Sequence, residues 1–300
     1  MTTLQIQRAK SQTHEHLLSI VHTETLSLEA GRTIRILDVG CGNGHLMAYL
    51  MENLPLLNPS LTYDIYGFDV HDHGVQSQGY FDESIRFLTH RLPATHWESK
   101  LALIRSTDSW PYPDQAFDIS LSNQVLEHIT DHPFFFSEIH RTLQTGGFSV
   151  HLFPLAHHLI ESHLSLPFVH WIKDFNLLHA TIRGMSQAGL GKYPAFKRDQ
   201  HMSVDEFSER HADFIHFYTN YLRASDVLKL AKRHRMRGSF KYTQEYYGRK
   251  LATILKIKPQ YKYARTRSGV MDWALSFFLK FVSSVTLFLE KKETYVSKIE

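Results

Sequence analysis

Three glycines at alternate positions, Gly40, Gly42 and Gly44, have a spacing that suits ligand binding. They follow an apolar run at residues 34–39, which is typical of a buried parallel strand. Glycine adopts positive φ angles and lets a ligand approach the backbone, so the strand is predicted to break into a binding turn. Residues 46–51 have helical character, and the amide end of such a helix would point at the ligand.

The same spacing distinguishes between cofactors. The dinucleotide fingerprint needs its third glycine where His45 stands, which argues against a nicotinamide or flavin cofactor. The segment 38–44, DVGCGNG, instead resembles the first motif of class I S-adenosylmethionine-dependent methyltransferases, of the small-molecule type with a methyltransferase-11-like core.

Further elements follow in the order that this resemblance implies. A second predicted strand, 63–69, ends in Asp69, whose carboxylate can accept hydrogen bonds from both hydroxyls of a ribose. The remaining matches are a third strand at 101–105, an aromatic-proline loop at 106–118, a fourth strand at 119–122 leading into Leu-Glu-His at 126–128, and a Gly-Gly turn before a fifth strand at 148–153. The sequence therefore predicts an α/β fold, a doubly wound Rossmann-like methyltransferase sheet.

The resemblance implies S-adenosylmethionine as cofactor and assigns roles to individual residues. The glycines pass under the carboxypropyl arm and ribose, Asp38 points towards the methionine ammonium, and Asp69 takes the ribose hydroxyls. Ser106 stands where the family often has an acid, so either Asp108 or backbone groups near Thr107 hold the adenine. The predicted cofactor-binding residues are Asp38, Gly40, Cys41, Gly42, Gly44, Asp69, Val70, Thr107, Asp108, Asn123 and Gln124, the last two nearest the reacting methyl group.

An alcohol acceptor would need a general base, and histidine is the natural choice. Among the 21 histidines, the candidates are His128, His157, His158 and His163, with Glu161 as an orienting partner. His163 is favoured because residues 161–163 are expected to overhang the cleft, whereas His128 could simply pack against the cofactor loop. No H-E-x-x-H or C-x-x-C spacing occurs, and Glu161 with His163 alone does not make a metal site, so none is predicted.

The chain divides into five predicted segments. An N-terminal helical cover at 1–33 has an apolar stripe that includes Leu17 and Leu18, and the cofactor-binding core follows at 34–153. A helical insertion at 154–224 is placed after the fifth strand, where it can form the acceptor pocket or a lid. The core ends at 225–260, with a helix at 225–232 and a sixth strand at 238–243, before a hydrophobic C-terminal helix at 261–300.

The C-terminal segment has two interpretations. Residues 270–289 are apolar enough to suggest one long helix, but Asp272 and Lys280 would each cost roughly 2.5–3.5 kcal/mol within a bilayer, which disfavours a span. The helix either lies on a membrane surface, with basic flanks at Arg265, Arg267, Lys291 and Lys292, or is a buried helix or homodimer contact.

Composition limits the location and the partners. The net charge of +3 does not demand a nucleic-acid partner, and the single cysteine, Cys41, fits a reducing compartment. The polar N-terminus does not resemble a secretory signal. We therefore expect a cytoplasmic protein, with peripheral contact at the inner membrane face under the first interpretation of the C-terminal helix.

The predicted function is O-methylation of a small-molecule acceptor such as a sugar or lipid-linked glycan. The run at 153–171 loosely resembles methyltransferases of cell-surface polysaccharide and natural-product pathways. A quinone or other lipid acceptor is one alternative, and a non-catalytic cofactor-binding scaffold is another. The Asn-Pro-Pro-Tyr type of motif is absent at 122–125, which disfavours nucleic-acid and protein amide nitrogens as acceptors.

Overall fold

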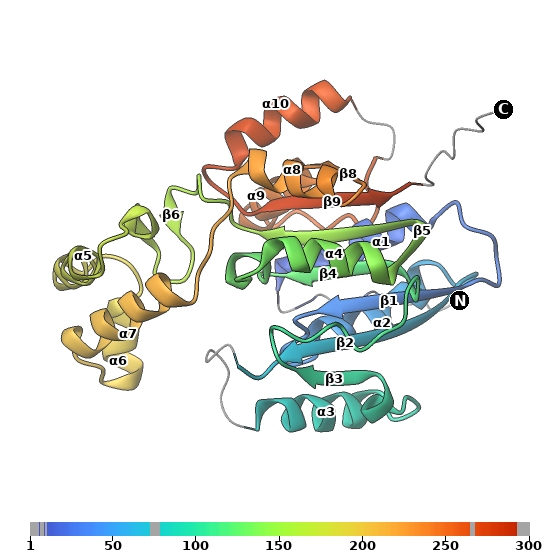
Figure 1. Cartoon of the computed structure of the whole chain (residues 1–300), viewed down its shortest axis with the longest axis horizontal. Helices are drawn as coiled ribbons and strands as arrows, with labels where there is room; N and C mark the ends of the chain where they lie inside the picture. The colour runs from blue at the N-terminus through green and yellow to red at the C-terminus, as the bar shows by residue number, and fades with distance from the viewer. Residues whose placement is uncertain (1–5, 7–8, 10, 73–78, 265–267, 293–300) are drawn as a thin grey trace.

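A seven-stranded sheet forms the centre of the computed structural model, which describes residues 6, 9, 11–72, 79–264 and 268–292 (Figure 1). The strand order is β3-β2-β1-β4-β5-β9-β8. Strands β1 to β5 are parallel, and β9 runs antiparallel to both of its neighbours. This order confirms the predicted doubly wound, Rossmann-like sheet. The strands are β1 (Thr33–Val39), β2 (Thr62–Val70), β3 (Leu101–Ile104), β4 (Phe117–Asn123), β5 (Leu143–Phe153), β8 (Met236–Ser239) and β9 (Val285–Lys291).

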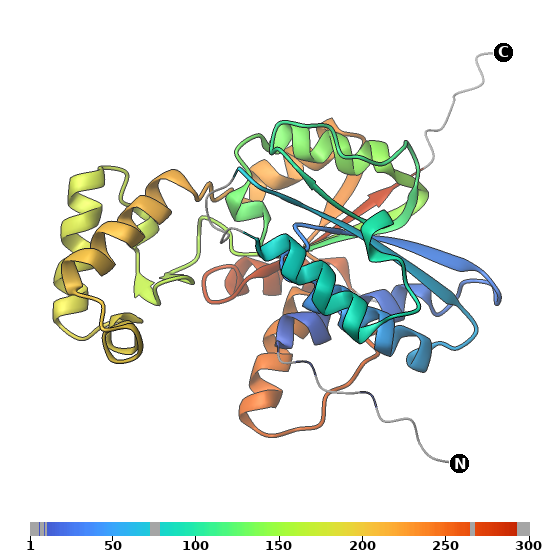
Figure 2. The ribbon, with the colours of Figure 1, turned by 90° about the horizontal axis from the view of Figure 1, so that it is seen from below.

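Helices cover both faces of the sheet (Figure 2). Side chains alternate between the faces along each strand. Thus Ile34 and Ile36 of β1 pack with α1, α2 and α9, whereas Leu37 and Val39 pack with α4 and α8. The helices around the sheet are α1 (Gln12–Thr25), α2 (His45–Leu57), α3 (Tyr80–Arg91), α4 (His132–Thr142), α8 (Ala224–Arg233) and α9 (Thr243–Ile254), with short 3-10 turns η1 (Trp97–Ser99) and η2 (Leu126–His128).

The segment between β5 and α8 forms a helical arm with its own small core. It extends from the end of the sheet at which the parallel strands terminate (Figure 1). Leu178 and Ile182 of α5 pack there against Phe207 of α7. The arm consists of β6 (Ile160–Glu161), β7 (Leu166–Pro167), η3 (Val169–Trp171), α5 (Phe175–Gln187), α6 (Tyr193–Gln200) and α7 (Val204–Phe217).

The long C-terminal helix predicted at 270–289 is wrong in its second half. The chain forms a short helix, α10 (Gly269–Leu279), and then turns into β9. All but one of the β9 residues are buried, because the strand lies between β5 and β8 with helices on both faces. A strand buried on both faces is apolar throughout, and such a run cannot be distinguished from a buried helix by periodicity.

The predicted sixth strand at 238–243 also begins and ends differently. The strand β8 ends at Ser239, and the chain turns at Tyr242, whose φ is 71°, before α9 begins at Thr243. The aromatic and β-branched residues that suggested a strand are used instead to fill the core, since Tyr242 is fully buried.

Helix α10 packs on α9 and leaves much of its apolar surface exposed. Among the helices that the structure describes, none has the length and apolarity needed to cross a membrane. Arg265 and Arg267, together with residues 1–5 and 293–300 of the predicted terminal segments, lie outside the described residues.

Candidate functional site

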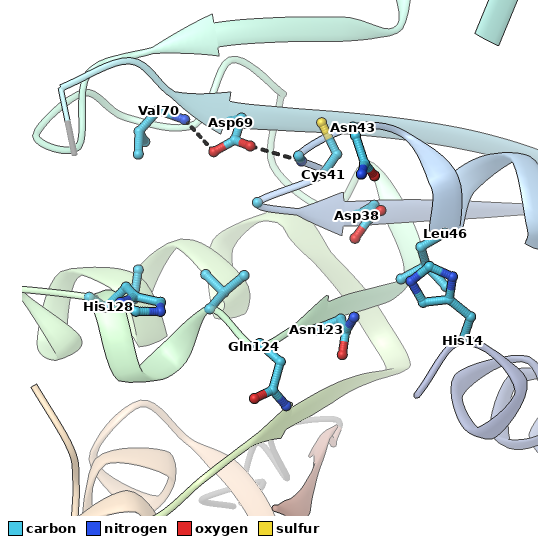
Figure 3. Close-up of a pocket in the computed structure, with 14 residues that line it drawn as sticks. His14, Asp38, Cys41, Asn43, Leu46, Asp69, Val70, Asn123, Gln124 and His128 are labelled. Atoms are coloured by element: carbon cyan, nitrogen blue, oxygen red, sulfur yellow. Dashed lines mark hydrogen bonds between the residues drawn. The ribbon is translucent and has the colours of Figure 1, made fainter. Parts of the chain in front are cut away.

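Two adjoining cavities lie where β1, β2 and β4 end. One measures about 330 Å³ and the other about 450 Å³. They are lined in common by Gly40, Asp69, Val70, Val125, His128 and Ile129, so together they form one cleft. Figure 3 shows the residues that line the smaller cavity. In open α/β sheets ligands bind at this position, outside the carboxyl ends of the strands where the strand order reverses.

The glycine loop between β1 and α2 forms the floor of this cleft. Gly40, Gly42 and Gly44 all have positive φ angles, of 70°, 50° and 72°. The N–H of Gly42 donates to Asp69 Oδ2 over 2.8 Å, which ties the loop to the end of β2. A Cβ placed on Gly42 would find only Asp69 Oδ2, at 4.0 Å, so the space above this residue is open for a ligand.

Two carboxylates set the charge of the cleft. Asp38 is 1% exposed, and its Oδ2 has no hydrogen-bond partner among the described residues. Burial raises the pKa of Asp38 well above its usual value, and the nearby Asp69 raises it further. Asp69 Oδ1 accepts from the N–H of Val70 over 2.8 Å. A positively charged ligand group beside Asp38 would relieve its desolvation and is the complement that this buried carboxyl lacks.

An acid that sequence reasoning missed lies in the loop after β2 and binds the loop after β3. Asp72, just beyond β2, accepts the Ser106 N–H at Oδ1 (2.9 Å) and the Ser106 hydroxyl at Oδ2 (3.0 Å). Burial alone would raise the pKa of Asp72, but these hydrogen bonds outweigh it and lower the pKa. Asp108 Oδ2 accepts the Arg105 N–H within its own turn, and Thr107 and Asp108 line the larger cavity.

The side chains of Asn123, the last residue of β4, and of Gln124, which follows it, differ in orientation. Asn123 lines the smaller cavity and has a buried Oδ1 without a partner among the described residues. Gln124 has a φ of 58°, and its N–H donates to Leu152 O over 2.8 Å. Its side-chain amide turns towards Leu152 O (3.3 Å) and Ser284 Oγ (3.4 Å). Asn123 therefore presents the unsatisfied polar atom at this edge of the cleft.

The predicted catalytic residues meet where the arm contacts the core. His163 Nδ1 lies 2.6 Å from Glu161 Oε1, which also accepts the Tyr221 hydroxyl over 2.8 Å. Burial would raise the pKa of Glu161, but the hydrogen bonds and charge of His163 outweigh it and hold the pKa below its usual range. The rings of His163 and His128 lie 5.3 Å apart in an edge-on arrangement. The structure thus brings together two segments 35 positions apart in the sequence.

Other histidines occupy different places from those that the sequence suggested. His157 contacts the ring of Phe281 and lines a separate cavity with Trp171 and Tyr221, outside the cofactor cleft. His14 of α1, which sequence reasoning missed, lines the cleft near Asp38 (Figure 3). Burial and the nearby His45 lower the pKa of His14 to about 4. The only sequence signal for this role of His14 was its position beside the apolar stripe of the first helix.

The sequence and the structure were compared with known proteins. A family model described as a methyltransferase domain matches residues 10–210. No curated protein matches the sequence. Among solved structures, the chain is similar to the YcgJ protein of Bacillus subtilis, with 14% identity, coverage of 93% of this chain and 100% of that one, and a TM-score of 0.44.

Two other similar structures were solved with ligands. Geranyl diphosphate C-methyltransferase of Streptomyces coelicolor, in complex with Mg²⁺, geranyl diphosphate and S-adenosylhomocysteine, is 12% identical over 93% of this chain and 79% of that one, with a TM-score of 0.46. Phosphoethanolamine N-methyltransferase 2 of Haemonchus contortus, in complex with S-adenosylmethionine, is 13% identical over 93% of this chain and 52% of that one, with a TM-score of 0.47.

Proposed function

The chain belongs to the class I S-adenosylmethionine-dependent methyltransferases, and from this premise we propose that it O-methylates a sugar or a lipid-linked glycan. The cofactor supplies an activated methyl group. The residues at the cleft fit this cofactor, because Asp38 Oδ2 and Asn123 Oδ1 have no hydrogen-bond partner within the described part of the chain, and the first of them suits an ammonium group. In this proposal Asp69, which lines the cavity at the end of β2, accepts the ribose hydroxyls.

The Glu161–His163 pair is the observation that carries the O-methylation proposal. A hydroxyl is a poor nucleophile at neutral pH and must lose its proton as the oxygen attacks the methyl group. Since the Glu161 carboxylate can only accept, His163 Nδ1 carries the hydrogen of their 2.6 Å contact. In the neutral imidazole the lone pair is then on Nε2, which takes up the proton of the substrate hydroxyl. His128, whose ring lies next to that of His163, lines the cofactor cleft.

The surface next to His163 favours a carbohydrate acceptor over a quinone. A cavity of about 640 Å³ is lined there by Glu206, Glu209 and Asp213 of α7, together with His163, Arg210, His211, Phe214 and Tyr218. Carboxylates accept hydrogen bonds from sugar hydroxyls, and aromatic rings pack on the apolar faces of sugars. A quinone offers carbonyl oxygens and would gain little from three carboxylates.

We further propose that the protein contacts anionic membranes through α10 and the end of α9. Val270, Trp273 and Phe278 are 77%, 69% and 67% exposed, and Ile254 and Leu255 lie exposed at the end of the adjoining helix. Basic residues along the same segment include Lys256, Lys258 and Lys280. Exposed aromatic and aliphatic side chains flanked by lysines are the pattern of a helix that lies in a membrane interface.

This surface is connected to the acceptor side of the cleft. The N–H of Leu159, in the loop after β5, donates to Phe281 O at the end of α10 over 2.9 Å. A lipid carrier held at α10 would therefore leave its glycan near the arm. Co-sedimentation with anionic vesicles should be lost in a Trp273→Ser/Phe278→Ser variant and retained in Leu177→Ser, which removes an exposed apolar side chain from the arm. Dimers that dissociate in the double variant, without vesicle binding, would instead make this face a dimer contact.

Methyl transfer from radiolabelled S-adenosylmethionine to a panel of sugars, lipid-linked glycans and quinones tests the main proposal. We expect transfer to a hydroxyl of a carbohydrate, with a large loss of kcat in His163→Asn and little change in cofactor affinity. Transfer to a quinone would favour the lipid alternative. Cofactor binding without transfer to any of these acceptors would favour a scaffold.

A further inference from the structure

Three side chains of types that bind metal ions converge where the arm meets the core. Glu127 and His128 belong to η2, the turn after β4, and His163 belongs to the β6–β7 hairpin of the arm. One potential ligand atom from each lies within 4.8 Å of the other two. The sequence showed no metal motif because these ligands come from two distant segments.

The Glu127 side chain supplies a second, independent sign of a missing ligand. It is 1% exposed, and neither of its carboxylate oxygens has a hydrogen-bond partner among the described residues. Burial raises its pKa to about 8. Buried polar groups nearly always have partners, so an unsatisfied carboxylate within such a cluster is consistent with a cation as its missing partner.

Both histidines are held in a tautomer that can bind a metal ion through Nε2. His128 Nδ1 lies 2.7 Å from Tyr218 O, and His163 Nδ1 lies 2.6 Å from Glu161 Oε1. Each of these oxygens can only accept, so Nδ1 carries the hydrogen in both rings and Nε2 carries the lone pair. Metal-binding histidines are typically oriented in this way, with the other ring nitrogen donating to a carboxylate or a carbonyl group.

We propose that Glu127, His128 and His163 bind one divalent transition-metal ion of the zinc type. Two imidazoles and one carboxylate are a ligand set that zinc uses when a fourth position stays open, whereas Mg²⁺ and Ca²⁺ prefer oxygen ligands alone. Tetrahedral bonds of about 2.1 Å place ligand atoms about 3.4 Å apart, so ligand atoms that now lie within 4.8 Å of one another must approach by up to about 1.4 Å on binding.

The bound ion joins the arm to the core and controls the reaction. This part rests on the proposed function, in which His163 Nε2 accepts the proton of the acceptor. The same lone pair cannot bind a metal ion and accept a proton, so the ion holds the base inactive until it is removed. Glu161 acts as a positioning residue, because it orients the imidazole in both states.

Metal binding to the full-length protein tests the site without reference to activity. After treatment with a chelator and its removal, Zn²⁺ titration by calorimetry should give one ion per chain, and Co²⁺ should give the visible absorption bands of a low-coordinate site. Glu127→Gln and His163→Asn should each weaken binding tenfold or more, and Glu161→Gln about tenfold. His157→Asn is the matched control, since His157 lies outside the cluster, and should bind as the wild type does.

Two results would overturn the metal site. One is a wild-type protein that binds neither Zn²⁺ nor Co²⁺ at 1:1 stoichiometry at about 100 µM. The other is binding that survives both Glu127→Gln and His163→Asn. Because His163 is partly exposed, the His163→Asn protein should fold even if the Glu127→Gln protein, which is changed at a buried position, does not. Circular dichroism of both variants checks this.

The methyl-transfer assay then separates this proposal from the proposed function. Zn²⁺ should slow transfer in the wild type, and a chelator should restore it. If Zn²⁺ binds as predicted but speeds transfer, the site stands and the role of His163 as a free base is wrong. If no acceptor is methylated, the binding experiment still decides the metal site.

Discussion

The substitution Gly42→Ala should separate the ligand-binding role of the glycine loop from its conformational strain. Gly42 has a φ of 50°, where an alanine costs roughly 1–2 kcal/mol. Part of this is offset by about 0.4–1 kcal/mol, because alanine restricts the unfolded chain. The net loss of stability is therefore about 1 kcal/mol, which lowers Tm by roughly 2 °C in a protein of this size.

The effect on cofactor binding should be larger than the effect on stability. The new Cβ meets no protein atom closer than 4.0 Å and instead occupies the space above the loop. If the cofactor lies there, the overlap costs about 1–3 kcal/mol, as for an extra methyl group in a packed interior. This corresponds to a roughly 5- to 150-fold increase in Kd for S-adenosylmethionine and S-adenosylhomocysteine, measured by calorimetry.

Gly31→Ala is the matched control. Gly31 also has a positive φ, of 83°, and an open position for a Cβ, but it precedes β1 at the opposite end of the strand from the cleft. It should lose a similar amount of stability and bind the cofactor as the wild type does. Unchanged affinity in Gly42→Ala, or an equal loss in both variants, would refute the placement of the cofactor over the loop.

Three further predictions concern other buried charges and rings. Asp69→Asn should weaken S-adenosylmethionine and S-adenosylhomocysteine binding by the same factor, tenfold or more, because both share the ribose; unequal losses in calorimetry would place Asp69 elsewhere. Burial lowers the pKa of His151 to about 3, so the unfolded state takes up the proton first as pH falls below about 6.5. Stability should therefore decline between about pH 6.5 and 3 by up to 1.4 kcal/mol per pH unit, and His151→Leu should flatten this slope in acid denaturation by about one proton. Arg249→Met should lower the free energy of unfolding in urea by about 3–5 kcal/mol. The guanidinium lies 3.0 Å from the buried Glu15 carboxylate, which loses its charge partner in this variant. Adding Glu15→Gln should recover part of the lost stability.

The cofactor end of the molecule was largely determined by local sequence. Strand, glycine turn and helix are contiguous from residue 34 to residue 57, and each depends on neighbours a few positions away. Gly42 and Asp69 were predicted as cofactor residues from such local signals, and the structure joins them by a hydrogen bond of 2.8 Å. The doubly wound sheet was predicted from the resemblance, which depends on the same kind of local motif.

Only the tertiary structure decided how distant segments combine. The run at 285–291 is largely buried because β9 is inserted between β5 and β8, and its periodicity does not distinguish a strand from a buried helix. The Asp72–Ser106 contact likewise joins residues 34 positions apart in the sequence. In the metal cluster, His163 meets His128 and Glu127, which lie 35 and 36 positions before it. Short-range periodicity reports which face of an element is buried, whereas the identity of the facing partner depends on how the whole chain packs.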